Sequence, residues 1–280
     1  MKTIGKSEIK WCPQDVGAAC TTSNSNVRKS SAIKVANYLE LANRIAEIQY
    51  FNPEHAMVFR GQGSDHRDHS SRTTIMPTIF RNDVRGRRPQ SHDLINRFES
   101  LKRAENNLLH VWRTAPIASN DNIKRYRILR WSILQHYEIC ATPLLDVTYS
   151  LRVAASFASL SEGTEGFVYV LGVPNITGTI TSSLETGLQV IRLSSVCPPQ
   201  ARRPHIQEGY LLGSYPELST FDEKQNYRLE EVDFGRRLIA KFCFDKATFW
   251  QRDEFPAITT EALYPDGHDE FAATAQTLSR

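Results

Sequence analysis

Ala56-Met57-Val58-Phe59-Arg60-Gly61-Gln62 is a short apolar run that ends in a cation, a glycine and an amide. The run predicts a buried strand over residues 56–59 with Arg60 at its polar end. A second stretch, Leu144-Leu145-Asp146-Val147-Thr148-Tyr149-Ser150, has the same character. It predicts a short strand over residues 144–148, followed by a helix that Ser150 can cap. Both strands therefore end in polar groups that are able to bind a ligand.

The residues before the first strand divide into a polar segment and a helical one. Residues 1–29 are polar and irregular, and we expect them to form an arm ahead of one domain that covers residues 30–280. A helix is predicted from Ser30 or Ser31 to the stop at Asn52-Pro53. The apolar positions of this helix are Ile33, Ala36, Leu41, Ile45 and Ile48.

The remaining elements follow from the spacing of apolar residues. Helical periodicity predicts helices over residues 93–112 and 123–137, with Trp112 and Trp131 in the core. Near-continuous apolar runs predict strands over 167–173 and 188–193, and alternation predicts a strand over 237–244. A helix interrupted by Pro265 is expected over 258–273. Because helices come first and strands later, the sequence predicts an α+β fold.

The composition narrows the class of protein. The chain has 280 residues, 40% hydrophobic and 23% charged, with a net charge of +3, which is only weak support for a nucleic-acid partner. No apolar run approaches the ~20 residues that span a bilayer, and the N-terminus lacks an apolar stretch of signal-peptide type. The five cysteines are odd in number and show no zinc or redox spacing. We expect reduced thiols and a cytoplasmic protein.

Four blocks of the sequence, taken in order, resemble those of the FRG domain, a family named after its Phe-Arg-Gly tripeptide. The first block holds Phe59-Arg60-Gly61-Gln62 and Met76-Pro77, and the second runs from Gln135-His136 through Asp146 to residues 154–158. The third covers residues 202–210 and the fourth 261–267. The resemblance extends from Phe59 to Phe271, with mild departures at Tyr137-Glu138, Ala141 and Val147.

FRG domains in turn look like members of the ADP-ribosyltransferase fold. The resemblance implies a split β-sheet with an N-terminal helical portion, NAD as substrate, no metal, and a cleft between Arg60 and residues 148–150. It implies Arg60 as the first element of the site, Thr148 with Ser150 as the second, and Gln207 or Glu208 as the third. The implied catalytic residues are Arg60, Gln207 and Glu208. The implied NAD-binding residues are Arg60, Gly61, Gln62, His136, Thr148 and Ser150.

The chemistry of NAD explains these residue types. An arginine offers a planar fork of donors for phosphate or ribose oxygens. The following glycine would let the backbone approach the ligand closely. Hydroxyls at a helix N-terminus can bind ribose, and a later carboxylate would stabilise the positive charge that develops at the anomeric carbon.

The third element is open in the sequence. If Gln207 and Glu208 lie in a strand, their side chains face opposite ways and only one can enter the site. We favour Gln207, because the FRG family usually has glutamine at that position. A neutral amide stabilises a developing cation less well than a carboxylate.

Each candidate also has a structural interpretation. Arg60 can be a buried arginine paired with Asp146, and His136 can bond a carbonyl at a helix end instead of acting as a base. Thr148 and Ser150 can be capping residues. The basic residues of 81–88 can be a solvated loop or a groove for nucleic acid. His66 and His69, with Asp65 and Asp68, are better explained as polar side chains of a surface loop than as a metal site.

Two functions follow as expectations. The first is an enzyme that transfers ADP-ribose from NAD to a protein or nucleic-acid acceptor, or that hydrolyses NAD. By resemblance to the family, such an activity would suit a toxin or a phage-defence effector. The second is a non-catalytic module of the same fold that binds a nucleotide, a nucleic acid or a protein, with residues 81–88 as its contact surface.

Overall fold

The computed structural model describes residues 9–15, 18–81, 89–114, 121–198, 200–250, 255–265, 267–269 and 272. They belong to two compact units, each assembled from three segments of the chain. The first unit comprises Met1–Ile75, Val147–Ile176 and Asp233–Leu263. The second comprises Met76–Asp146, Thr177–Val232 and Tyr264–Arg280.

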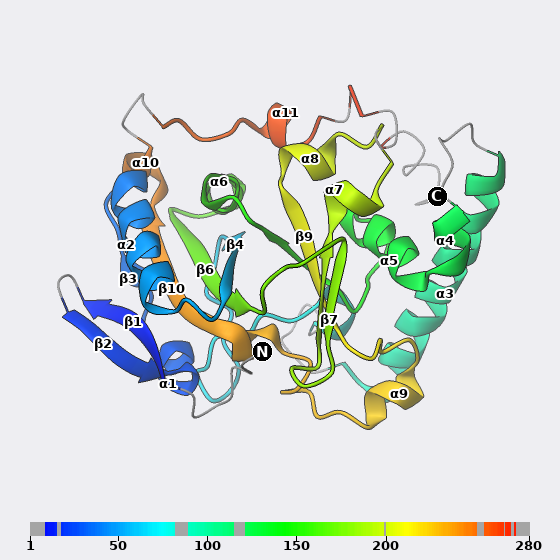
Figure 1. Ribbon diagram of the computed structural model, residues 1–280, viewed down its shortest axis with the longest axis horizontal. Helices are drawn as coiled ribbons and strands as arrows, with labels where there is room; N and C mark the ends of the chain where they lie inside the picture. Colours follow the sequence, from blue (N-terminus) through cyan, green and yellow to red (C-terminus); the bar gives the residue numbers. More distant parts are fainter. Residues whose placement is uncertain are drawn as a thin grey trace. The chain divides into compact units, whose positions relative to one another are not determined.

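The first unit is built on a sheet in the order β3-β10-β6-β4-β5 (Figure 1). Its strands are β3 (Ile33–Lys34), β10 (Leu238–Asp245), β6 (Glu165–Val173), β4 (Ala56–Gln62) and β5 (Leu145–Thr148). Only the β3–β10 pairing is parallel among the pairings described for this unit. The strands predicted over 167–173 and 237–244 from their apolar residues are confirmed as β6 and β10. Both strands lie inside the sheet, and residues on both of their faces are buried.

Helices α2 (Tyr38–Phe51) and α6 (Leu151–Leu160) belong to the same unit. The buried positions of α2 are Leu41, Ile45 and Ile48, as the periodicity predicted, and Asn52 ends the helix. Its predicted start was wrong. Asn37 caps α2 by accepting a hydrogen bond from the Glu40 N–H, and Ile33 lies in a strand. Helix α6 packs against β4 and β6.

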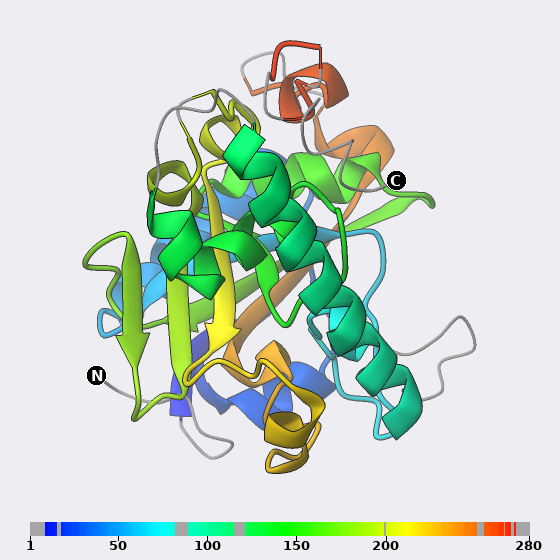
Figure 2. The ribbon, with the colours of Figure 1, turned by 90° about the vertical axis from the view of Figure 1, so that its right-hand side faces the viewer.

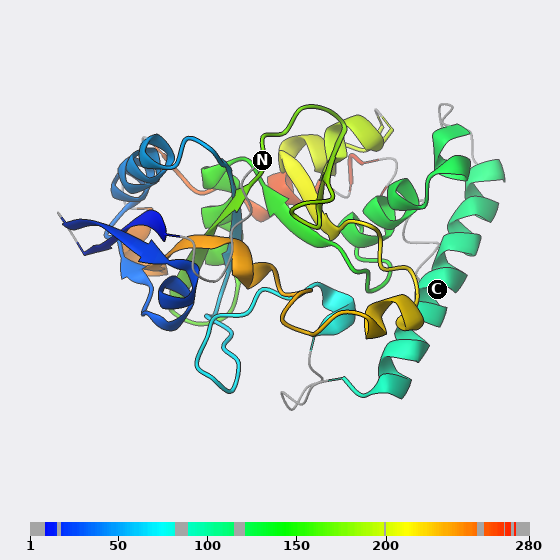
Figure 3. The same cartoon turned by 60° about the horizontal axis from the view of Figure 1, so that its bottom comes forward.

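Of the arm predicted over residues 1–29, the structure describes residues 9–15 and 18–29, and these are not irregular. They form the hairpin β1 (Ile9–Asp15) and β2 (Ala18–Ser23) and the helix α1 (Asn24–Lys29), which Ser23 caps. Both β1 and α1 contact β10 (Figure 3). Asn24 and Arg28 are buried, and the Asn24 side chain donates to the Leu238 carbonyl at 2.8 Å. The polar composition that suggested an arm therefore reflects side chains that bind the main chain of a distant segment.

The second unit combines a three-stranded antiparallel sheet with helices (Figure 2). The strands are β7 (Ile180–Ser183), β8 (Leu188–Arg192) and β9 (Gly209–Ser214). The predicted helix over 93–112 is confirmed as α3 (Ser91–Thr114). The second predicted helix divides at Tyr126 into α4 (Asp121–Arg125) and α5 (Arg127–His136). Trp112 and Trp131 lie in the apolar core of this unit, as predicted.

Short helices complete both units. The second contains η1 (Thr78–Phe80), α7 (Leu193–Val196), α8 (Arg203–Ile206) and α9 (Phe221–Gln225). The first contains η2 (Phe234–Arg237), α10 (Lys246–Phe249) and α11 (Thr260–Leu263). The helix predicted over 258–273 is largely wrong, because α11 ends at Leu263, two residues before Pro265.

The fold is mixed α and β, with mostly antiparallel strands, which agrees with the expected class at that level. Within the described ranges, no helix has the length and apolar content needed to cross a membrane.

Candidate functional site

The predicted site residues divide between the two units. The first unit holds Arg60, Gly61, Gln62, Thr148 and Ser150. The second holds His136, Gln207 and Glu208. Asp146 also belongs to the second unit, so its predicted pairing with Arg60 joins residues of different units and stays a prediction.

In the first unit, β4 brings Arg60 next to the start of α6. Phe59 pairs with Thr148 across β4 and β5, so Arg60 is one residue beyond the predicted hydroxyl cluster. On its other side, Arg60 pairs with Tyr169 of β6. Burial and the Asp65 carboxylate raise the pKa of Tyr169, and the charge of Arg60 acts in the opposite direction. The strand thus places a half-buried guanidinium beside a tyrosine that stays protonated.

Gly61 serves packing instead of ligand approach. A β-carbon at this position would lie 1.8 Å from the Ala154 main-chain oxygen and 2.8 Å from the Ala158 nitrogen. The space above Gly61 is therefore filled by the backbone of α6. This corrects the interpretation that the glycine leaves room for NAD, because the helix occupies that side of the strand.

Thr148 and Ser150 form the turn between β5 and α6. The Ser150 N–H donates to the Thr148 hydroxyl at 3.0 Å. Ser150 occupies the N-cap position of α6, but its side chain makes no capping hydrogen bond. The predicted capping position is thus confirmed and the predicted capping bond is wrong, since Thr148 provides the acceptor in this turn.

In the second unit, His136 faces the Asp146 carboxylate. His136 is the last residue of α5, and its Nδ1 lies 3.6 Å from Asp146 Oδ1. The His136 side chain is 3% exposed and that of Asp146 is 37% exposed. A buried imidazole therefore lies beside a carboxylate that is partly exposed. At this distance Nδ1 faces the carboxylate but lies beyond ordinary hydrogen-bond length.

A chain of hydrogen bonds fixes the position of Asp146. The Leu144 N–H donates to the Thr142 hydroxyl at 3.1 Å, and this hydroxyl donates to Gln135 Oε1 at 2.5 Å. Gln135 Nε2 donates in turn to Asp146 Oδ2 at 2.6 Å. Because Gln135 precedes His136 on α5, neighbouring residues of one helix bind both carboxylate oxygens.

The second ring nitrogen of His136, Nε2, could take part in proton transfer. His136 Nε2 is buried and has no hydrogen-bond partner among the residues that the structure describes. Gly209 provides the space beside the ring, since a β-carbon there would lie 3.5 Å from His136 Cε1 and 2.7 Å from Leu193 Cδ1. A buried imidazole with a carboxylate at one nitrogen can accept or donate a proton at the other.

Gln207 and Glu208 do not lie in a strand. Gln207 is the C-cap of α8, and Glu208 has a positive φ of 44° just before β9 begins at Gly209. Strand alternation therefore does not govern them, which corrects the predicted geometry. Gln207 is buried and Glu208 is exposed. The neutral amide is thus the one of the two that is turned toward the interior of the unit.

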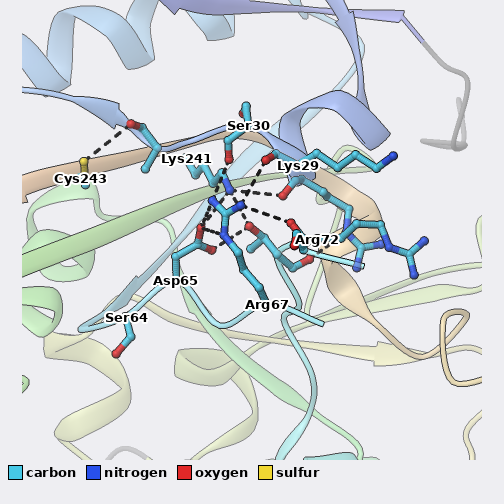
Figure 4. A network of polar contacts seen from close by, with 12 residues as sticks. Lys29, Ser30, Ser64, Asp65, Arg67, Arg72, Lys241 and Cys243 are labelled. Carbon is cyan, nitrogen blue, oxygen red and sulfur yellow. Dashed lines mark hydrogen bonds and ion pairs between the residues drawn. The ribbon is translucent and has the colours of Figure 1, made fainter. Parts of the chain in front are cut away.

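A polar network in the first unit was not predicted as such (Figure 4). Lys241 of β10 is 1% exposed, and its Nζ donates to Asp65 Oδ2 at 3.0 Å and to the Thr73 hydroxyl at 2.6 Å. Arg67 also pairs with Asp65, at 2.8 Å. The network holds the loop after β4 against β10. Its one sequence signal is a lysine in the middle of an apolar strand.

Two further expectations concern polar loops. Within the described part of the chain, no group of His, Cys, Asp and Glu could hold a metal ion, and the side chains of Asp65 and Asp68 bind Arg67 and Arg72. Of the basic segment 81–88, residues 82–88 lie outside the described residues. Its role as a contact surface stays a prediction.

Comparison with known proteins gives one match. The family model of the FRG domain matches residues 55–165. No curated protein and no solved structure matches the chain. The matched residues include Phe59-Arg60-Gly61-Gln62 and the segment from Gln135 to Ser150, which contains His136 and Asp146. On this match, residues 55–165 of the chain are similar to the FRG domain.

Proposed function

We propose that the protein consumes NAD, either by transferring ADP-ribose to a protein or nucleic-acid acceptor or by hydrolysing NAD. The observation that carries the proposal is the His136–Asp146 pair. It joins a buried imidazole, whose Nε2 has no partner among the described residues, to a carboxylate whose side chain is partly exposed. The resemblance of FRG domains to the ADP-ribosyltransferase fold suggests the substrate.

The residues of the pair suit the chemistry of such a reaction. The reaction breaks the bond between nicotinamide and the ribose, and nicotinamide leaves with the bonding electrons. Asp146 would stabilise the positive charge that develops on the ribose, as a carboxylate held in place by Gln135. His136 would accept, at Nε2, the proton that the acceptor or water loses when its oxygen or nitrogen bonds to the ribose.

A non-catalytic binding module is the second candidate. The burial of Gln207 and the exposure of Glu208 favour it. The buried position holds the neutral Gln207, and the carboxylate of Glu208 is exposed. A domain that lacks a buried carboxylate at this place would bind a nucleotide while stabilising a developing cation less well.

The experiment that separates the two candidates measures nicotinamide release. Purified protein is incubated with labelled NAD, with and without total cell extract. We expect released nicotinamide, with label on a macromolecule for a transferase or on free ADP-ribose for a hydrolase. His136→Gln and Asp146→Asn should each lower turnover by about 10²-fold or more, the usual contribution of a positioned acid or base.

A matched control is His92→Gln, because the His92 side chain is 68% exposed and lies on α3. This variant should keep full turnover. Absence of nicotinamide release under all conditions, together with measurable NAD binding, would support the binding module. A toxin or phage-defence role is part of the same proposal, and slow growth of cells that express the native protein but not the His136→Gln variant would support it.

A further inference from the structure

A buried carboxylate near the end of the chain binds two elements of the second unit. Asp269 is 2% exposed. Its Oδ2 accepts a hydrogen bond from the Tyr137 hydroxyl at 3.0 Å and another from the Arg203 main-chain N–H at 2.9 Å. Its Oδ1 accepts from the Ala272 N–H at 3.2 Å. A single side chain thus connects the end of α5, the start of α8 and the C-terminal segment, by which we mean the described residues from Tyr264 to Ala272.

The two partners of Asp269 are adjacent to predicted site residues. Tyr137 is the C-cap of α5 and directly follows His136, and the two rings meet edge to face with centroids 5.7 Å apart. Arg203 begins α8, and that helix ends at the buried Gln207. The position of Asp269 therefore bears on both His136 and Gln207.

Arg203 provides a second connection to the C-terminal segment. Its guanidinium carbon lies 4.5 Å from the centre of the Tyr264 ring and 5.8 Å from that of Tyr137. The same guanidinium pairs with Glu138 Oε1 at 2.9 Å. Cation–π contacts on two aromatic rings and a charge-assisted hydrogen bond hold this side chain in one place.

We infer that Asp269 is a positioning residue, which fixes the His136 ring and the α8 turn from the C-terminal segment. The inference rests on the proposed function, because it assigns Asp269 to the site that contains His136. Asp269 acts through Tyr137 and Arg203 and does not touch substrate. A displacement of a reacting group by about 1 Å can lower a rate by ~10²-fold, so a residue that holds the ring can matter without contacting the ligand.

The test replaces Tyr137 by Phe and Asp269 by Asn in the full-length chain. Tyr137→Phe keeps the ring and removes one hydrogen bond, and Asp269→Asn keeps the shape and one acceptor oxygen. We expect kcat to fall by about 10-fold in each variant while KM changes by less than about 3-fold, since ground-state binding is not the target. The His136 Cε1–Hε1 signal, observed by NMR at one fixed pH, should move in both variants.

The matched control is Asp68→Asn in the first unit. Asp68 also accepts two main-chain N–H bonds, from Ser70 at 2.8 Å and Arg72 at 2.9 Å, but it belongs to the first unit, whereas α5 and α8 belong to the second. This variant should leave kcat and the His136 signal unchanged. All rates are measured well below each variant's melting temperature.

The outcomes separate the inference from the proposed function. If both variants lower only the melting temperature, and leave kcat and the His136 signal as in the native protein, Asp269 is merely structural and the inference is overturned. If the native protein releases no nicotinamide, the proposed enzyme fails. The NMR signal then decides alone: movement in both variants supports positioning of His136, and an unchanged signal rejects it.

Discussion

Gly61 and Ala154 are in main-chain contact, because a β-carbon on Gly61 would lie 1.8 Å from the Ala154 oxygen. The contact presses α6 onto β4 at the residue that follows Arg60. The glycine of the Phe-Arg-Gly tripeptide is therefore explained by helix–sheet packing. Its neighbour Arg60 is held in the sheet by the pairing of β4 with β6, where it lies opposite Tyr169.

Gly61→Ala should destabilise the first unit strongly. The neighbouring atoms of Ala154 and Ala158 belong to the backbone of a helix, so α6 or β4 must shift to admit the methyl group. Overpacking of this kind costs about 1–3 kcal/mol and occasionally more, and we expect the upper end. Urea denaturation followed by circular dichroism measures it. Gly178→Ala is the control, because a β-carbon at Gly178 would meet nothing within 4 Å. Equal stability of the two variants would contradict the packing explanation.

Some elements of the fold could be predicted from local sequence and others could not. The apolar positions of α3 and the run in β6 repeat over enough residues to show a period. Strand β7 and helices α7 and α8 have four residues each, which is too short for any period. Helix α1 was missed for another reason: its Arg28 is buried against Asp233, and no local pattern reports a partner so distant in the chain.

Lys241→Met should destabilise the loop that follows β4. Methionine fits the apolar strand but gives no donor to Asp65 or Thr73. Removing one member of a buried pair costs about 3–5 kcal/mol, and we expect the lower end because Arg67 still faces Asp65. Lys34→Met, at an exposed position of β3, is the control and should change stability by less than about 0.5 kcal/mol. A native-like free energy of unfolding for Lys241→Met would show that the network contributes little.

The same network should make stability depend on acid pH. Burial alone would raise the pKa of Asp65, but hydrogen bonds from Thr73 and Lys241 and the charges of Lys241 and Arg67 lower it below its ordinary value. The folded state therefore favours the ionised form. Its contribution is complete above the unfolded pKa of about 3.9 and is lost as the pH falls through the lower folded pKa.

Melting temperatures at pH 6 and pH 3 test this sign. The native protein should lose more stability between these values than Asp65→Asn, because the variant has no carboxylate to protonate at that place. Asp68, whose pKa is lowered below its ordinary value by the Arg72 main-chain and side-chain bonds in spite of burial, acts in the same direction in both proteins. Identical losses in the two proteins would remove Asp65 from the acid response.

In the candidate site, too, features set by the local sequence could be predicted, and contacts between separate segments could not. The strand ends that hold Arg60 and Thr148 were predicted because apolar runs end there. The partners of Asp146 were not, since Gln135 and His136 approach it through the turn between α5 and β5. The conformation of Gln207 and Glu208 was wrong because a four-residue helix and a positive φ at a glutamate leave no signal in sequence.

Arg60 gives a prediction for ligand binding. If its guanidinium binds a pyrophosphate or ribose, Arg60→Ala should abolish NAD binding, measured by calorimetry, while circular dichroism shows a folded protein. Arg60→Lys keeps the charge and loses the planar fork, so it should restore stability more than binding. If Arg60→Ala unfolds instead, the structural interpretation as a partner of Asp146 is favoured.

The last prediction concerns Gln207 and Glu208. Gln207 is buried and Glu208 is exposed, so we expect Gln207 to be the one that reaches the ribose. Gln207→Ala should lower kcat more than it raises KM, because hydrogen bonds to the ribose strengthen as positive charge develops. Glu208→Ala is the matched control on the neighbouring exposed residue and should leave both constants within about 2-fold.

Gln207→Glu makes the test sharper. A carboxylate stabilises a cation better than an amide, so turnover should stay equal or rise. The same carboxylate is buried, and the variant should therefore melt at a lower temperature than the native protein unless NAD is bound. If Glu208→Ala abolishes turnover while Gln207→Ala does not, the exposed residue is the catalytic one. If neither change affects nicotinamide release, neither residue is the third element, and the Asp146 carboxylate beside His136 would stabilise the cation without them.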